Sequence, residues 1–183
     1  MPPAIAQTIK DTIYWQYAKL ISKSAGFGNK QRAFQMSRFL ALRDGDIQWS
    51  TTIREWVKER EKLEECIYCG VCGDLTTEHI LPRTHHGPDI PDNAVRVCKK
   101  CNSSKGDKRL YEWYGYEHRD EIPRIAEGKY LKLLYELHRV NGTLELHKDD
   151  LSRSLCSKCR LRHKCVEAKK DGSLSIFCLE GIF

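Results

Sequence analysis

The sequence lacks a long hydrophobic run, and it has no cysteine before residue 66. No segment approaches the roughly 18 consecutive apolar residues that a membrane-spanning helix needs, and the start at Met1-Pro2-Pro3 does not resemble a signal peptide. Glycine and proline number 12 and 6 in 183 residues, which excludes collagen-like and low-complexity chains. These absences predict a cytoplasmic (intracellular) protein that makes no contact with a membrane.

Cysteine is abundant in the rest of the chain, at nine residues. Because thiols stay reduced inside cells, metal binding is the expected use of so many cysteines. They form two groups, one over 66–101 and one over 156–178, and each group contains a C-x2-C pair. The two sulfurs of such a pair can converge on one metal centre from a tight turn. The sequence therefore predicts two metal sites.

The first group predicts a structural zinc site built from two C-x2-C pairs. Its first pair could be Cys66 with Cys69 or Cys69 with Cys72. The Cys66 and Cys69 pair is favoured because Gly70 then follows the second ligand and can relax the turn. Cys72 would be left over. The predicted zinc ligands are Cys66, Cys69, Cys98 and Cys101.

The second group holds one C-x2-C pair followed by two single cysteines. Four thiolates could close a second structural zinc site, which is the favoured interpretation. The spacing C-x2-C-x5-C also resembles the cysteine run of some iron–sulfur nucleases, so a [4Fe–4S] cluster is the alternative. The ligands in either case would be Cys156, Cys159, Cys165 and Cys178.

Hydrophobic periodicity predicts helices in the first 65 residues. Apolar residues recur every three or four positions over 4–24 and 31–43, which indicates two amphipathic helices. A third helix is expected from Thr52, because Thr52 and Glu55 have the spacing of a capping box.

Further along the chain, Leu75–Leu81 and Ala94–Val97 are predicted to be short strands on either side of a loop rich in proline, glycine and histidine. A short helix is expected over 99–105 and a longer one over 123–140. The predicted fold class is α+β and mostly helical. Its expected parts are an N-terminal helical region (1–65), a strand-containing domain (66–116), a connecting helix (117–148) and a Cys-rich metal-binding tail (149–183).

Polar residues stand at recognisable spacings between the two cysteine pairs of the strand-containing domain. Thr77-Glu78-His79-Ile80-Leu81-Pro82 ends the first predicted strand, Asn93 precedes the second, and Asn102 and Lys105 follow the last cysteine. With the C-x2-C-G knuckle, this order resembles the HNH endonuclease family in its zinc-knuckle form, over about residues 66–109. The resemblance implies a ββα-metal unit, in which the zinc site ties two strands to a helix.

The resemblance also implies phosphodiester hydrolysis, which needs an attacking water, a base and a cation on the phosphate. His79 is the candidate general base, because a histidine pKa of about 6.5 suits neutral pH. Asn102 and Glu78 are oxygen donors of the kind that Mg²⁺ or Mn²⁺ prefers, and the family places its catalytic cation at these two positions. Asn93 would pin the loop and orient His79.

Two positions depart from the commoner family pattern. Asn102 stands where many members have histidine, and Glu78 stands where aspartate is commoner. Adjacent residues of a strand also point to opposite faces. Glu78 and His79 are therefore expected to reach one phosphate only if the strand end is twisted or bulged.

The formal charge of +6 is not concentrated in the predicted nuclease domain. Residues 66–116 contain seven basic and six acidic residues, whereas Arg153–Lys170 is the densest basic run. Basic residues in this run could hold the DNA backbone without reading its sequence. The candidates for nucleic-acid contacts are Lys105, Arg83, Arg160, Arg162 and Lys164.

The predicted function is that of a metal-dependent HNH endonuclease acting on DNA, with double-stranded DNA as the favoured substrate. Structural zinc and catalytic Mg²⁺ or Mn²⁺ would be its cofactors. One ββα-metal site cuts one strand, so a homodimer would account for a double-strand cut. The alternatives are a non-catalytic zinc module that binds nucleic acid or protein, and a nuclease-related iron–sulfur protein.

Overall fold

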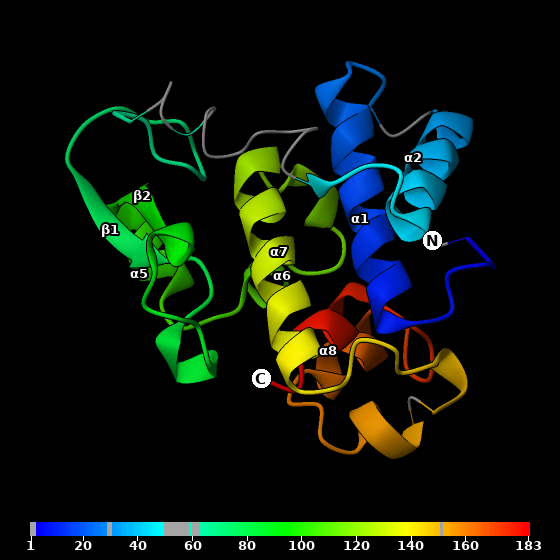
Figure 1. Cartoon of the computed structure of the whole chain (residues 1–183). Helices are drawn as coiled ribbons and strands as arrows, with labels where there is room; N and C mark the ends of the chain where they lie inside the picture. The colour runs from blue at the N-terminus through cyan, green and yellow to red at the C-terminus, as the bar shows by residue number, and fades with distance from the viewer. Residues whose placement is uncertain (1–2, 29–30, 50–58, 60–62, 151) are drawn as a thin grey trace. The chain divides into compact units, whose positions relative to one another are not determined.

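Helices and one two-stranded antiparallel sheet make up the described part of the chain, so the fold is α+β as predicted. None of the helices in that part is both long and apolar enough to cross a bilayer. The third helix predicted from Thr52 lies outside the described residues. The computed structural model, drawn in Figure 1, describes residues 3–28, 31–49, 59, 63–150 and 152–183.

The chain divides into two compact units. Unit 1 contains residues 1–54 and 134–182, and unit 2 contains residues 55–133 with Phe183. Residues 1–54 of the predicted N-terminal region and the Cys-rich tail up to residue 182 thus belong to one unit, the predicted nuclease segment belongs to the other, and the predicted connecting region (117–148) is divided between them.

Unit 1 is built on the helices α1 (Ile9–Ser24) and α2 (Arg32–Asp44). A capping box sets the start of α1, because Thr8 Oγ1 accepts the Asp11 N–H at 3.1 Å and Asp11 Oδ2 accepts the Thr8 N–H at 3.2 Å. This cap explains why α1 begins later than the predicted residue 4. Most of α1 is buried.

The C-terminal segments of unit 1 contain the helix α8 (Arg162–Glu167) and several shorter turns. They pack on the start of the chain: the Lys10 N–H donates to the Leu144 carbonyl at 2.9 Å, and Thr8 pairs with His147 in an isolated antiparallel bridge. The short 3₁₀ and π segments of the whole described chain are Arg83–His85, Pro91–Asn93, Arg119–Glu121, Lys148–Asp150, Ser152–Cys156 and Ile176–Leu179.

Unit 2 contains the sheet, formed by β1 (Leu75–His79) and β2 (Ala94–Cys98), followed by α5 (Lys99–Lys105). The strands run antiparallel beside each other (Figure 1), with Leu75 opposite Cys98 and His79 opposite Ala94 in the register. The first strand is shorter than predicted, because the chain leaves the ladder after His79. Ile80 and Leu81 are fully buried instead.

Two further helices complete this region, α6 (Leu110–Tyr114) and α7 (Arg124–Val140), and the boundary between the units falls within α7. Pro123 immediately precedes α7, in agreement with the helix predicted over 123–140. Tyr111 of α6 packs edge-on against Tyr130 of α7 with 5.7 Å between ring centroids. The aromatic residues of α6 thus contribute to packing in unit 2.

Candidate active site

Four thiols of unit 2 meet between the knuckle, the sheet and a helix. The Sγ atoms of Cys66, Cys69, Cys98 and Cys101 all lie within 4.8 Å of one another. Cys98 ends β2 and caps α5, and Cys101 lies in the first turn of α5. In the knuckle, the Gly70 N–H donates to the Cys66 carbonyl at 2.8 Å with φ of +72° at Gly70, a conformation that glycine adopts without strain.

The spacing of these thiols fits a single tetrahedral ion. Four thiolates at about 2.3 Å from zinc stand about 3.8 Å apart, and Cys69 Sγ and Cys98 Sγ are 3.8 Å apart. The Cys101 N–H donates to Cys98 Sγ and lowers the pKa of the Cys98 thiol to about 7, which favours the thiolate that a metal binds. The four cysteines could therefore hold a metal ion such as zinc, and Cys72 lies outside the group.

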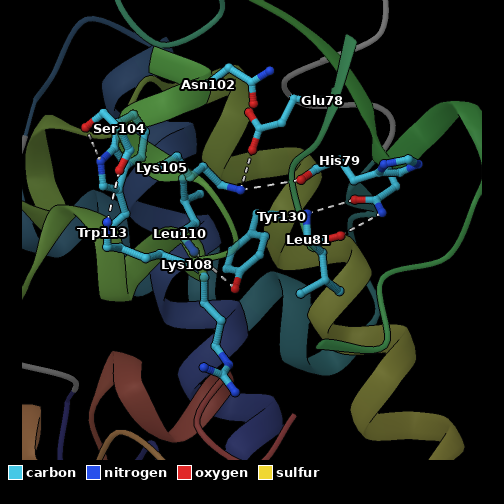
Figure 2. A network of polar contacts seen from close by, with 12 residues as sticks. Glu78, His79, Leu81, Asn102, Ser104, Lys105, Lys108, Leu110, Trp113 and Tyr130 are labelled. Carbon is cyan, nitrogen blue, oxygen red and sulfur yellow. Dashed lines mark hydrogen bonds and ion pairs between the residues drawn. The ribbon is translucent and has the colours of Figure 1, made fainter. Parts of the chain in front are cut away.

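Glu78 faces α5, where it forms an ion pair with Lys105 (Figure 2). Lys105 is fully buried and Glu78 is 8% exposed. The Lys105 ammonium also donates to the His79 carbonyl at 3.4 Å. Burial raises the pKa of Glu78, and the charge of Lys105 opposes that shift. Lys105 was predicted to contact phosphate, but in the structure its charge is directed at Glu78.

We expect Lys105→Met to destabilise unit 2, because it leaves a buried carboxylate without its counter-charge. Breaking a buried pair from one side costs about 3–5 kcal/mol. Urea unfolding of the zinc-loaded protein measures the loss. The double variant Glu78→Gln with Lys105→Met should recover most of it, and Lys108→Met, at an exposed lysine, should change little. Equal stability of the single and double variants would contradict this account of the pair.

His79 points away from Glu78, as expected for adjacent residues of a strand (Figure 2). Its side chain is 29% exposed, and its Nε2 lies 3.1 Å from Asp89 Oδ1. Arg83 Nη1 lies 3.8 Å from the other carboxylate oxygen of Asp89. No motif spacing in the sequence singles out Asp89, which stands in the loop between the strands. The structure brings it to the candidate base.

Asn93 joins the two ends of the loop between the strands. Its side chain is fully buried. Its Oδ1 accepts the Leu81 N–H at 2.9 Å, and its Nδ2 donates to the carbonyls of Leu81 at 2.9 Å and of Pro88 at 2.8 Å. A side chain at Gly87 would not fit, since its Cβ would lie 2.8 Å from the Pro82 carbonyl oxygen. The loop carrying Asp89 is thus held tightly beside His79.

We expect Asn93→Ala to loosen this loop. Three hydrogen bonds disappear and buried backbone groups lose their partners, at a cost of about 2–4 kcal/mol. Asn93→Asp keeps the acceptor for the Leu81 N–H but turns a buried carboxylate oxygen toward the Leu81 and Pro88 carbonyls, so it should be at least as unstable as Asn93→Ala. Urea unfolding and hydrogen exchange of the Leu81 amide measure both effects. Wild-type exchange in Asn93→Ala would contradict the proposed pinning.

Asn102 approaches the same face of β1 as Lys105 does. Its Nδ2 donates to Thr76 Oγ1 at 3.1 Å, and Thr76 shares a strand face with Glu78. The amide oxygen of Asn102, which is the atom that Mg²⁺ prefers, is not the atom used in this contact. The predicted residues therefore divide: Glu78 and Asn102 lie on the side of α5, and the His79 ring lies on the other side.

The remaining basic candidates lie at the surface. Arg83 is exposed in the loop beside Asp89. In unit 1, Arg160 is exposed, Arg162 pairs with Asp171 at 3.3 Å, and the Lys164 ammonium lies 3.6 Å from Glu167. At least two of the seven basic residues of this run, Arg162 and Lys164, therefore have an acidic partner. The residues with ion-pair partners are Arg83, Arg162 and Lys164.

Comparison with known proteins shows what the site resembles. Residues 66–111 match the family model described as HNH endonuclease. These residues form an HNH endonuclease domain. The match covers the four clustered cysteines, β1, β2, α5 and the start of α6. It thus contains every predicted site residue of unit 2.

A curated relative supports the same family. The chain is similar to the "SPbeta prophage-derived putative HNH endonuclease YoqL" of Bacillus subtilis (strain 168), with 24% identity over 132 residues. The alignment covers 64% of this chain and 54% of the relative, so it spans about half of that protein's length. No solved structure matches the chain significantly.

Proposed function

We propose that the chain is a metal-dependent endonuclease that hydrolyses phosphodiester bonds in DNA, with His79 as general base. The observation that carries the proposal is the His79–Asp89 pair inside an HNH domain, at a partly exposed strand end. A nuclease domain implies a nucleic-acid substrate, and the relative's printed name supports the same activity.

The pair with Asp89 suits His79 for proton abstraction. When Nε2–H donates to the Asp89 carboxylate, Nδ1 carries the lone pair that can accept a proton from water. A carboxylate partner also fixes the tautomer and the orientation of the imidazole. Asn93 supports this geometry indirectly, because it fixes the loop that carries Asp89.

The catalytic cation would be held by oxygen donors of the α5 side. Because the His79 ring lies on the other side of β1, the base and the cation would act on one phosphate only after the end of this strand turns on DNA binding. The Asn102 amide oxygen fits a hard cation such as Mg²⁺ or Mn²⁺. Glu78 is a weaker candidate ligand, because its carboxylate already forms an ion pair with Lys105. It would bind the cation only if that ion pair broke. A bound cation would stabilise charge on the phosphate and the leaving oxygen.

Double-stranded DNA is the proposed substrate, with Arg83, Arg160, Arg162 and Lys164 as backbone contacts. Such contacts would add affinity that falls with salt concentration but would carry no sequence choice. A single active site of this kind nicks one strand. A double-strand cut would require a second copy of the chain or successive nicks.

Supercoiled plasmid DNA tests the proposal directly. The zinc-loaded protein should convert it to the nicked form with Mg²⁺ or Mn²⁺, and excess EDTA should stop the reaction. Single-stranded DNA and RNA of the same sequence show whether the duplex is preferred. Failure to cut any of these nucleic acids would overturn the proposal, and retention of DNA without cleavage would favour a binding module instead.

A further inference from the structure

The described residues enclose cavities of very different size in the two units. In unit 2, a pocket of about 260 Å³ lies between the cysteine knuckle and the start of α7. Its volume is close to the lower end of the range for small-molecule sites, about 300–1,000 Å³, so it has room for an organic group. The cavity of unit 1 measures about 10 Å³ and is lined by Cys156, Cys159, Cys165 and Cys178, and the metal predicted for these cysteines stays a prediction.

The walls of the larger pocket come from three segments of unit 2. Ile67 belongs to the knuckle, Arg96 belongs to β2, and Pro123, Arg124 and Ile125 belong to the chain that enters α7. The Ile67 N–H donates to the Arg96 carbonyl at 3.0 Å, which fixes the knuckle beside the strand. The pocket therefore presents both apolar side chains and guanidinium groups.

Arg96 lies on the same face of the sheet as the candidate base. It stands opposite Thr77 in the register, and residues opposite each other in an antiparallel pair share a face. Thr77 and His79 are two positions apart in β1, so their side chains share that face as well. Arg96 and Thr77 are exposed there, whereas Glu78, on the other face, is buried against α5. The exposed face thus carries both His79 and an arginine of the pocket.

The Arg96 guanidinium is available for an anion. In the part of the chain that the structure describes, no carboxylate forms an ion pair with it. Arg96 and His79 are diagonal neighbours across the strand pair, at about 7–8 Å, a spacing that long side chains can bridge. A guanidinium binds phosphate through two parallel hydrogen bonds. A phosphate held by Arg96 would therefore lie close to His79.

Charge in and around the pocket favours an anionic ligand. The described acidic residues of the lining are Glu59 and Glu65. Glu59 Oε2 lies 2.8 Å from Lys129 Nζ, which offsets its charge. The same ammonium donates to the Ala94 carbonyl at 3.1 Å and so holds α7 on β2. With the two arginines and Lys129, three cationic groups accompany two acidic ones, and the five sum to +1.

We propose that the pocket binds one nucleotide of the DNA strand next to the bond that is cut, with the phosphate on Arg96 and the base against Ile67 and Ile125. The proposal rests on the proposed nuclease function, because the DNA would reach the pocket along the face that carries His79. A base enters such a pocket only after it leaves the stack, which is easiest for an unpaired base. DNA with an unpaired nucleotide should therefore bind more tightly than the fully paired duplex.

Fluorescence anisotropy of the zinc-loaded full chain on labelled DNA tests the phosphate contact. No Mg²⁺ or Mn²⁺ is added, so binding is measured without cleavage. Arg96→Gln should weaken binding about 10–100-fold, as expected for the loss of charge-assisted hydrogen bonds. It should also lower the slope of the logarithm of the binding constant against the logarithm of the salt concentration by about 1. Lys100→Gln, at an exposed lysine of α5, is the matched control and should change neither. An Arg96→Gln protein with wild-type affinity and slope would overturn the proposal.

Three DNA probes test the base contact: a paired duplex, the same duplex with one unpaired nucleotide, and that duplex with an abasic sugar at the unpaired position. The wild-type protein should prefer the second probe by about tenfold, because burial of an apolar group the size of a side chain is worth that much. Ile125→Trp fills the pocket and should remove this preference without changing the salt slope. Circular dichroism and zinc content check that this variant is folded. Equal binding of the base-containing and abasic probes by the wild-type protein would show that no base enters the pocket and would refute the proposal.

Failure of the pocket assignment and failure of the nuclease function give different results. Plasmid cleavage by the wild-type protein, together with unchanged binding by Arg96→Gln, would overturn the pocket and leave the nuclease. Binding that depends on Arg96 without any cleavage would overturn the nuclease function and support the pocket. His79→Ala should keep the preference for the unpaired nucleotide, because the His79 ring is not part of the pocket lining. Absence of binding to all three probes would overturn both.

Discussion

Cys66→Ser is expected to abolish zinc binding and unfold most of unit 2. The sheet of this unit has two strands of five residues each, and a two-stranded hairpin is marginally stable on its own. Structural zinc contributes about 10–16 kcal/mol to small zinc-binding domains. Since the four thiols join the knuckle to β2 and α5, loss of one ligand removes the main link among them.

Zinc content, circular dichroism and limited proteolysis measure this effect. The variant should bind no zinc ion at the four-cysteine site, and the protease should cleave it within residues 63–110. Cys72→Ser is the control, because Cys72 is exposed and lies outside the four-thiol group. Chelation of the wild-type protein should reproduce the variant. A Cys66→Ser protein with wild-type zinc content and protease resistance would refute the assignment of this ligand.

His79→Ala is expected to reduce the DNA cleavage rate by about 10²–10⁴-fold, the usual loss when a general base is removed. The ring is partly exposed and its described partner is the surface residue Asp89. Folding and zinc binding should therefore remain near wild type. Single-turnover cleavage of plasmid DNA measures the rate, and the midpoint of urea unfolding checks the fold.

Two matched variants separate catalysis from loop structure. Asp89→Asn should cut about 10–100-fold more slowly, because it removes the charge that supports the imidazole but leaves the base in place. His86→Asn changes a neighbouring exposed histidine, and asparagine tolerates the φ of +63° found there. It should cut at the wild-type rate. If His79→Ala also cuts at that rate, His79 is not the base.

Features set by local spacing were predictable from the sequence. The C-x2-C pairs, the turn at Gly70 and the helix after Pro123 depend on residues within a few positions of one another, and the structure has them as predicted. Asn93 bonds to Leu81 and Pro88, and its role in orienting His79, which rests on the family pattern, stays a prediction.

Features set by contacts between distant residues were not predictable in the same way. Lysine is usually found at the protein surface. Only the packing of α5 on β1 shows that Lys105 is buried against Glu78. Asp89 is one of several loop acids, and only the loop conformation distinguishes it. Likewise, no sequence periodicity predicts that residues 1–54 and 134–182 share unit 1. That arrangement depends on contacts between residues far apart in the sequence, such as the pairing of Thr8 with His147.

The discontinuity of unit 1 has a consequence for the order in which the protein folds. During synthesis, residues 55–133 leave the ribosome before residues 134–182, which α1 needs as packing partners. Unit 2 can therefore acquire its metal while α1 is still without those partners. A folded unit 2 also shortens the flexible chain between the two halves of unit 1, which lowers the entropy cost of joining them. Zinc starvation should thus slow the folding of a unit that contains none of the knuckle cysteines.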